Sequence, residues 1–398
     1  MATISPYGPG LRVKLILMRF SLRTPAVALA AASILAAQTI PAPAEAAPAL
    51  VAPGAPMRAF PQDPPKTIDL PNGEKLTMPR DGWASTCSQG PTGTLRLPGQ
   101  EPQRVMLTVS HCVNTMPGFP DLKNEFYAPV GTEYKRIGER IASNHVTPEA
   151  MNLGDPMQSI RTADWGVVRI DDGVTETGLS HSRDFNGGVQ GEPVKITHVR
   201  DFRTLAPGEV SVDNFGQPIC KDGATTGRTC AKQIGRTRNG IYSWGLNYVQ
   251  GDSGGVNFDP RDGAAVGVSS MTLGPLGKAQ PVDRIIEDAY GIPDGHVNEV
   301  FTPTDSTAPR ENFTTSGDEE ERVAAEIKQL NPDFKQPVPR DELRKAVDNA
   351  QQEAAGLAQK ASQGQFDPAE INRAIGYHSD RIGYWGGASL GEEIGKRL

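Results

Sequence analysis

Short apolar runs separated by turn-forming residues dominate the middle of the chain. Examples lie at 93–97, 194–199 and 264–269, each between clusters rich in glycine, proline, asparagine or aspartate. Alternation of apolar and polar positions predicts β-strands, and regular turn signals between such runs predict antiparallel sheet in barrels or a sandwich. We therefore expect a mostly β domain over residues 83–300.

The pattern changes after residue 300. Residues 301–318 are rich in Pro, Thr, Ser and Asp, which predicts a linker. Apolar residues then recur at helical spacing, at Val323, Ile327 and Leu330 and again at Leu343, Val347, Ala350, Ala354 and Leu357. The Asp-Pro-Ala-Glu string at 367–370 is typical of a helix start. Residues 319–398 thus predict a small helical C-terminal extension. It would form a separate module, dock on the β domain or stay partly disordered.

The first 47 residues have the pattern of a secretory signal peptide. Lys14, Arg19 and Arg23 precede an alanine-rich apolar core at 26–37, and small residues follow it. The alternative is a membrane anchor, but the core is shorter than the ~20 apolar residues of a span. We expect no integral membrane span and a secreted product, extracellular or associated with the cell wall. Residues 48–82, rich in proline and alanine, predict an exposed linker or a short pro-segment.

Charge and cysteine content narrow the classes further. The net charge is −7, so the sequence does not indicate a basic surface for binding nucleic acid. Export would place the four cysteines in an oxidising environment, and an even number predicts two disulfides in one of three pairings. They are Cys87, Cys112, Cys220 and Cys230. They form no close C-x-x-C doublet, so we expect no metal site, and nothing indicates an organic cofactor.

Three short motifs carry candidate chemistry. Ser253 lies in the string Gly-Asp-Ser-Gly-Gly at 251–255, a tight turn that would expose its hydroxyl and free its N–H group. Alone, this string is as typical of a surface turn between strands. His111 ends one strand-like apolar run, and Asp164 begins another. A serine nucleophile needs a base and a carboxylate that orients it, and the chain order His, Asp, Ser is known for such triads.

The three motifs resemble those of the chymotrypsin-like serine proteases, and more narrowly those of the bacterial streptogrisin-like branch. The narrower resemblance rests on Asp-Trp-Gly-Val-Val-Arg at 164–169 and on the loop closed by cysteines at 220–230. It covers residues 83 to 290, about half of the chain. It implies two six-stranded antiparallel β-barrels with the active site in the cleft between them. His111 and Asp164 would come from the first barrel and Ser253 from the second.

The resemblance also implies roles for further residues. It pairs Cys87 with Cys112 and Cys220 with Cys230, and it forms an oxyanion hole from the backbone N–H groups of Gly251 and Ser253. Asn247 would lie at the base of the specificity pocket, and Ser270, Met271 and Thr272 would form the wall that pairs with the substrate backbone. Because Asn247 is not acidic, we expect an apolar or medium-sized residue before the scissile bond.

Asp252 is expected to have an internal partner. The chain lacks the Ile-Val-Gly-Gly type of N-terminus that trypsin-like zymogens free on cleavage. The resemblance to the bacterial branch implies an internal arginine as the partner of Asp252 instead.

Together these features predict a secreted serine endopeptidase that acts on proteins or peptides through an acyl-enzyme intermediate. An alternative is a catalytically latent or silent protein of the same fold, with the helical extension recruiting a cell-surface partner. A third hypothesis is an esterase for small acyl esters. The chain order His, Asp, Ser differs from the order known for α/β-hydrolases, so esterase activity would be a side activity at most.

Overall fold

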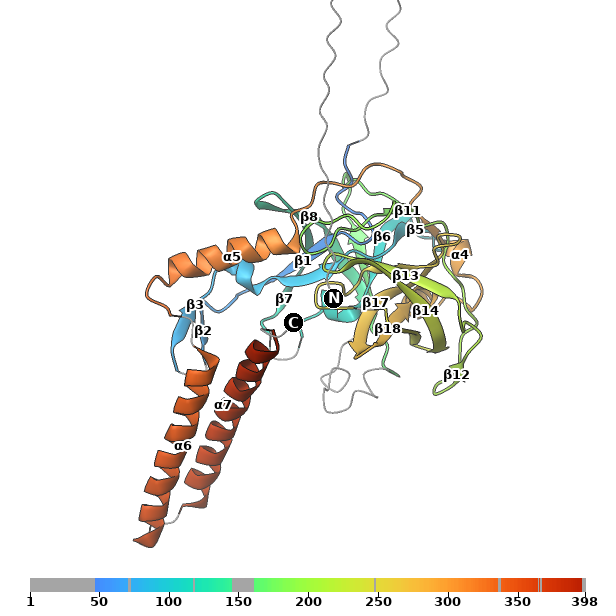
Figure 1. Cartoon of the computed structure of the whole chain (residues 1–398). Helices are drawn as coiled ribbons and strands as arrows, with labels where there is room; N and C mark the ends of the chain where they lie inside the picture. Colours follow the sequence, from blue (N-terminus) through green and yellow to red (C-terminus); the bar gives the residue numbers. More distant parts are fainter. Residues whose placement is uncertain are drawn as a thin grey trace, which may run out of the picture. The chain divides into compact units, whose positions relative to one another are not determined.

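The computed structural model describes residues 47–70, 73–116, 119–144, 161–246, 248–335, 338–363, 365 and 367–395. The expected secretory signal falls outside these ranges except for residue 47, and Asn247 falls outside them too. Two antiparallel β-sheets form the main body, and helices follow at the C-terminal end of the chain (Figure 1). The expected mostly β fold with a helical C-terminal region is therefore confirmed.

Eight of the described strands form the first sheet. Their spatial order is β19 (Phe301–Pro303), β5 (Thr92–Leu95), β6 (Gln103–Thr108), β9 (Gly166–Ile170), β8 (Glu133–Ser143), β7 (Leu122–Val130), β1 (Pro56–Pro61) and β4 (Ser85–Ser88). β6 buries its last four residues, and β9 buries every residue except Arg169. No ladder among the described residues joins β4 to β19, so the first of the two expected barrels is not confirmed as closed.

The second sheet closes into a barrel. Six described strands go round it in the order β14 (Gly227–Thr237), β13 (Pro218–Gly223), β16 (Val256–Phe258), β17 (Ala265–Leu273), β18 (Leu276–Pro281) and β15 (Gly240–Trp244). β15 pairs back to β14, and β12 (Val210–Ser211) adds a short strand at its edge. Closure pairs the backbone groups that an open sheet would leave at its edges. One of the two expected six-stranded barrels is thus confirmed.

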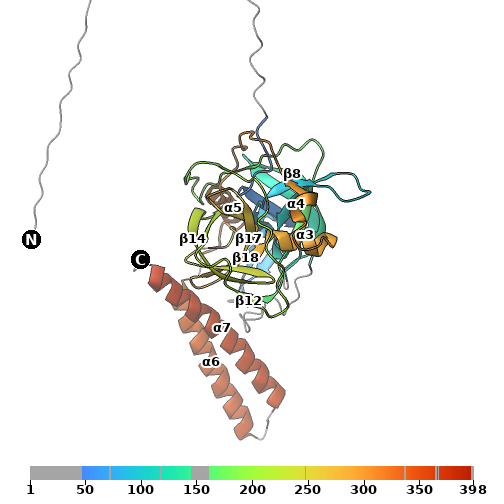
Figure 2. The same ribbon diagram turned by 90° about the vertical axis from the view of Figure 1, so that its right-hand side faces the viewer.

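Short elements connect and cover the sheets. They are β2 (Thr67–Asp69), β3 (Lys75–Thr77), β10 (Leu179–Ser180), β11 (Val194–Lys195), the 3₁₀-helix η1 (Arg80–Trp83), α1 (Ser110–Val113), α3 (Val282–Tyr290) and α4 (Val297–Val300). α3 buries Val282, Ile285 and Ile286, spaced i, i+3, i+4 on one face. These residues belong to an apolar cluster that also contains Val105 of β6 and Val256 of β16. This cluster therefore contains residues of both sheets, and a second, smaller cluster lies within the closed barrel. Figure 2 shows α3 beside α4.

The segment before residue 83 differs from the expected exposed linker. Residues 51–61 are buried, and β1 lies in the first sheet between β7 and β4. Alanine and proline are depleted in strands, so composition hid this strand. The expected linker at 301–318 likewise begins with β19, which pairs with β5. Both segments belong to the β domain at these positions.

Three longer helices follow. α5 (Ser316–Leu330), α6 (Pro339–Ser362) and α7 (Pro368–Gly395) cover the expected helical region. α7 begins at the expected start, where Asp367 Oδ1 accepts a hydrogen bond of 2.8 Å from the backbone N–H of Ala369. α6 and α7 form a hairpin, in which the His378 ring bonds to Glu353 at 2.6 Å. No helix among the described residues is both long enough and apolar enough to cross a membrane.

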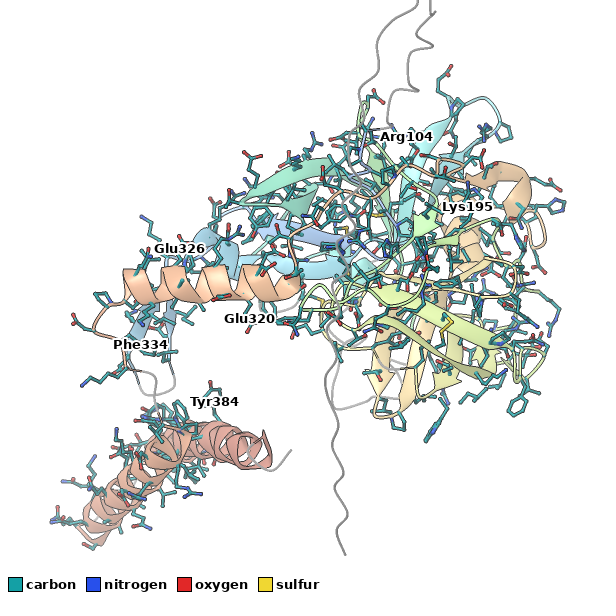
Figure 3. The ribbon with its side chains drawn as sticks, turned by 45° about the horizontal axis from the view of Figure 1, so that its top comes forward. Arg104, Lys195, Glu320, Glu326, Phe334 and Tyr384 are labelled. Atoms are coloured by element: carbon teal, nitrogen blue, oxygen red, sulfur yellow. A yellow bond between two sulfur atoms is a disulfide. The ribbon has the colours of Figure 1, made fainter. Side chains whose placement is uncertain are left out.

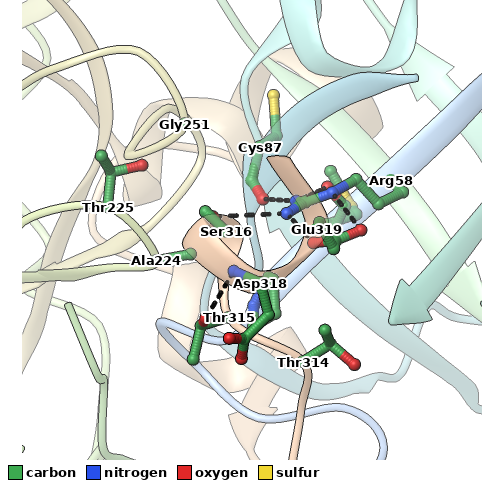
Figure 4. Close-up of polar contacts among 12 residues, drawn as sticks. Arg58, Cys87, Ala224, Thr225, Gly251, Thr314, Thr315, Ser316, Asp318 and Glu319 are labelled. Carbon is green, nitrogen blue, oxygen red and sulfur yellow. Dashed lines mark hydrogen bonds and ion pairs between the residues drawn. The ribbon is translucent and has the colours of Figure 1, made fainter. Parts of the chain in front are cut away.

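α5 is anchored at both ends to strands that precede it in the chain. At its start, the Glu319 carboxylate pairs with the buried Arg58 guanidinium of β1, and Arg58 also reaches Ser316 Oγ (Figure 4). Thr315 caps the helix by accepting a hydrogen bond of 3.0 Å from Asp318 N–H. At its end, the Asn331 side chain exchanges two hydrogen bonds with the backbone of Thr77. α5 is therefore a docked helix.

Candidate active site

His111 and Asp164 meet because their strands are neighbours. His111 lies in α1 just after β6, Asp164 just before β9, and these strands pair with Thr108 opposite Gly166. His111 Nδ1 is 2.9 Å from Asp164 Oδ2, and the backbone N–H of His111 donates to Asp164 Oδ1 at 3.2 Å. An ionised carboxylate only accepts, so this bond places a proton on Nδ1 and leaves Nε2 with a free lone pair in the neutral ring.

The surroundings shift both groups in opposite directions. Burial lowers the pKa of His111, but the Asp164 charge and hydrogen bond raise it more, so the net direction is upward. Burial raises the pKa of Asp164, and the attraction of His111 outweighs it and holds this pKa below its usual range. Ser270 Oγ also donates to Asp164 Oδ2 at 2.7 Å. Asp164 is therefore held as a carboxylate beside the ring.

Ser253 is presented by a turn that the first sheet holds in place. The Ser253 carbonyl accepts a hydrogen bond of 2.7 Å from Ser88 N–H, and Ser88 Oγ donates to the Gly251 carbonyl at 2.7 Å. Gly254 has φ +81°, and a Cβ there would lie 2.7 Å from the Ser88 carbonyl oxygen. Within the described chain, no protein acceptor takes the N–H groups of Gly251 or Ser253. Both donors remain available beside the serine.

The carboxylate next to the serine is fully buried. Asp252 forms an ion pair with Lys221 at 2.8 Å, and it accepts hydrogen bonds from the N–H groups of Thr225 and Thr226. The expectation of an arginine partner is wrong, because the internal cation is a lysine on β13. Arg228, in the same cysteine-closed loop, pairs with Asp222 instead. The buried ion pair between Asp252 and Lys221 nevertheless holds the turn that carries Ser253.

His111 and Ser253 line the same cavity. It has a volume of about 440 Å³, and its other walls include Trp83, Met116 and Phe119. Within the described residues, the His111 ring hydrogen-bonds to Asp164 only. Hydrogen bonds between a nucleophile and its base are often long without substrate. A second cavity, of about 320 Å³, shares Gln250 as a wall and extends to Arg58 and Glu319 of the α5 anchor.

The residues expected to bind substrate are only partly accounted for. Ser270, Met271 and Thr272 lie in β17, and Ser270 is tied to Asp164. Asn247 lies outside the described residues. Sequence analysis missed Lys278 on the neighbouring strand β18, whose Nζ donates to the Thr162 carbonyl at 2.6 Å. Burial lowers the pKa of Lys278 to about 8, against the pull of Asp164.

Two disulfides support the site. They join Cys87 to Cys112 and Cys220 to Cys230, the pairs that the resemblance implied. The first connects β4 to α1 next to His111. The second crosses from β13, which carries Lys221, to β14. Each disulfide thus lies one residue from a side chain of the site.

No family model matches the chain, and no curated protein does. Among solved structures, Thermobifida fusca protease A is similar with 18% identity and a TM-score of 0.36, over 64% of this chain and 98% of that chain. A Nocardiopsis protease is similar with 19% identity and a TM-score of 0.34, over 55% and 93%. The VesB protease of Vibrio cholerae is similar with 12% identity and a TM-score of 0.29, over 59% and 62%. At these values the likenesses carry no inference about activity.

Proposed function

We propose that the chain is a serine endopeptidase that cleaves peptide bonds through an acyl-enzyme intermediate. The observation that carries this proposal is the hydrogen-bonded pair of His111 and Asp164, which borders the same cavity as Ser253. A free serine hydroxyl is a weak nucleophile, and an adjacent base activates it. Ser253 is the nucleophile and His111 the base.

The mechanism follows from the hydrogen-bond pattern. Ser253 Oγ attacks the substrate carbonyl carbon while His111 Nε2 removes its proton. Asp164 keeps the other proton on Nδ1 and stabilises the imidazolium that forms. The N–H groups of Gly251 and Ser253 donate to the developing oxyanion, where loss of one donor typically costs about 3 to 4 kcal/mol. His111 then returns the proton to the leaving amine, and water releases the acyl group by the same steps.

The substrate is a protein or peptide. The wall at Ser270, Met271 and Thr272 would pair with its backbone, and Asn247 would lie at the base of the pocket for the residue before the scissile bond. We infer a preference for an apolar or medium-sized residue there. The two disulfides fit an oxidising compartment, which supports secretion to the extracellular side or the cell wall.

Labelling with a fluorophosphonate followed by intact-mass measurement tests the proposal. We expect one adduct on the full chain and none on Ser253→Ala, because only an activated serine reacts. Ser362→Ala, an exposed serine on α6, is the matched control and should label like the parent. An unlabelled parent chain would overturn the proposed activity and favour the latent binding protein.

A further inference from the structure

Three acidic side chains from separate segments meet in the described structure. Asp201 lies between β11 and β12, Glu287 lies on α3, and Asp294 lies in the turn between α3 and α4. One carboxylate oxygen of each lies within 4.8 Å of the corresponding oxygens of the other two. None of the three lines the cavity that holds His111 and Ser253. The cluster is therefore separate from the proposed catalytic residues.

Two oxygens of this cluster are buried without a hydrogen-bond partner. Glu287 is 6% exposed; its Oε2 accepts from Thr204 Oγ1 at 2.9 Å and from Arg284 Nη1 at 2.6 Å. Its Oε1 is buried and accepts no hydrogen bond from the described residues. Asp201 Oδ1 is likewise buried and accepts none from them. Buried carboxylate oxygens are normally paired, because burial of unpaired charge is costly. Two such oxygens at one acidic cluster point to a bound cation.

The local cation does not balance the cluster. Among the described ion pairs, Arg284 is the only cation that contacts a member of the cluster. It pairs with Glu287, and it also pairs with Asp288 outside the cluster. Asp201 Oδ2 accepts from Val297 N–H at 3.0 Å, and Asp294 Oδ1 accepts from Thr204 N–H at 3.0 Å. These neutral donors orient the carboxylates but add no positive charge. The remaining negative charge favours a divalent ion.

We propose that Asp201, Glu287 and Asp294 form a Ca²⁺ site. Oxygens bound about 2.4 Å from one Ca²⁺ on opposite sides of it are about 4.8 Å apart, so the observed limit fits a single coordination shell. The donors are carboxylate oxygens without histidine or cysteine, which favours Ca²⁺ over Zn²⁺. Three carboxylates from three segments suit the flexible geometry of Ca²⁺ better than the strict octahedron of Mg²⁺.

The ion would link parts of the fold that no disulfide connects. It would tie the segment before β12 to α3, whose apolar face packs in the core shared by both sheets. A ligand that binds only the folded state stabilises it in proportion to the logarithm of its concentration. The site therefore regulates stability, and it does not depend on the proposed catalytic activity.

Equilibrium dialysis with ⁴⁵Ca²⁺ tests the site on the full chain carrying Ser253→Ala, which prevents self-cleavage. We expect one saturable ion per chain between about 0.1 and 10 mM, the range of extracellular modules. Thermal unfolding should then shift upward by about 5 °C at saturation. Asp201→Asn and Asp294→Asn should each weaken binding at least tenfold, while their amide oxygens still accept the bonds from Val297 and Thr204.

Asp172→Asn, an exposed acidic position outside the cluster, should bind Ca²⁺ like the parent. Circular dichroism verifies that the variants fold. If Asp201→Asn does not fold, the binding measurement on Asp294→Asn, at an exposed position, decides the test alone. No saturable binding up to about 10 mM would overturn the proposal. Unchanged binding in Asp294→Asn, or equal competition by Mg²⁺, would overturn it as well.

Discussion

The proposed base owes its state to one neighbour. Burial opposes both shifts, but attraction and a hydrogen bond between the two groups raise the pKa of His111 and lower that of Asp164. The pair stabilises the fold fully above the unfolded pKa of Asp164, 3.8, and below the unfolded pKa of His111, 6.5. Its contribution is lost as pH rises through the folded pKa of His111, and also as pH falls through that of Asp164. The proposed catalysis needs neutral His111, so the rate should rise with pH over the range in which this stabilisation is lost.

Asp164→Asn should therefore change both the rate and its pH dependence. We expect a loss of about 10⁴-fold in kcat, because the amide can bind the wrong tautomer of the ring. The acid limb of the kcat/KM profile should move to lower pH, since the charge that raises the pKa of His111 is gone. A pH–rate series on a peptide ester measures both effects, with Asp171→Asn as control. An unshifted acid limb would contradict the assigned pairing.

Lys221 and Asp252 form the most deeply buried ion pair of the site, with both side chains fully covered. Removing one partner of such a pair costs about 3 to 5 kcal/mol, because the other charge stays buried without compensation. We expect this loss in the free energy of unfolding for Lys221→Met, measured by denaturant titration. Lys232→Met, at an exposed position of neighbouring β14, should be near neutral. Asp252→Asn added to Lys221→Met should recover part of the loss, and an additive second loss would argue against the pair.

At the scale of elements, α5 depends on one buried ion pair at its start. Arg58 is 2% exposed and Glu319 is 8% exposed at their side chains. Glu319→Gln keeps the shape but removes the charge that compensates Arg58. We expect amide hydrogen exchange in α5 to speed up at least tenfold, with α7 unchanged. Glu326→Gln, on the same helix and exposed to solvent, is the control (Figure 3). Exchange that rises equally in both variants would show that α5 is not anchored there.

At the scale of the whole molecule, the site lies where two sheets meet, and its covalent links differ in span. Cys87–Cys112 closes 25 residues and Cys220–Cys230 closes 10. In the chain-entropy model these loops are worth about 3.5 and 2.7 kcal/mol. We expect replacement of both cysteines by alanine to cost more stability at the first pair than at the second.

Replacing Cys87 and Cys112 by alanine should also lower activity more than replacing Cys220 and Cys230. Cys87 precedes Ser88, which holds the serine turn, and Cys112 follows His111. Denaturant unfolding and peptide-ester hydrolysis of the two double variants measure the two effects. A larger loss of activity from the second pair would contradict this assignment.

Features that depend on neighbours along the chain were open to sequence analysis. The start of α7 at Pro368 follows from capping chemistry within four residues. The strands β6 and β9 follow from short runs of apolar residues. The candidate pair of His111 and Asp164 came from short motifs in their chain order. In each case the signal is local, because side-chain periodicity and capping act over a few residues.

Only the tertiary structure decided which distant groups meet. It placed Lys221 on Asp252, bonded Ser270 to Asp164, and put β1, which begins and ends with proline, into a sheet. It closed one sheet into a barrel through the pairing of β14 with β15. These features depend on strand pairing and register, which burial over the whole molecule selects and which leave no local mark in the sequence.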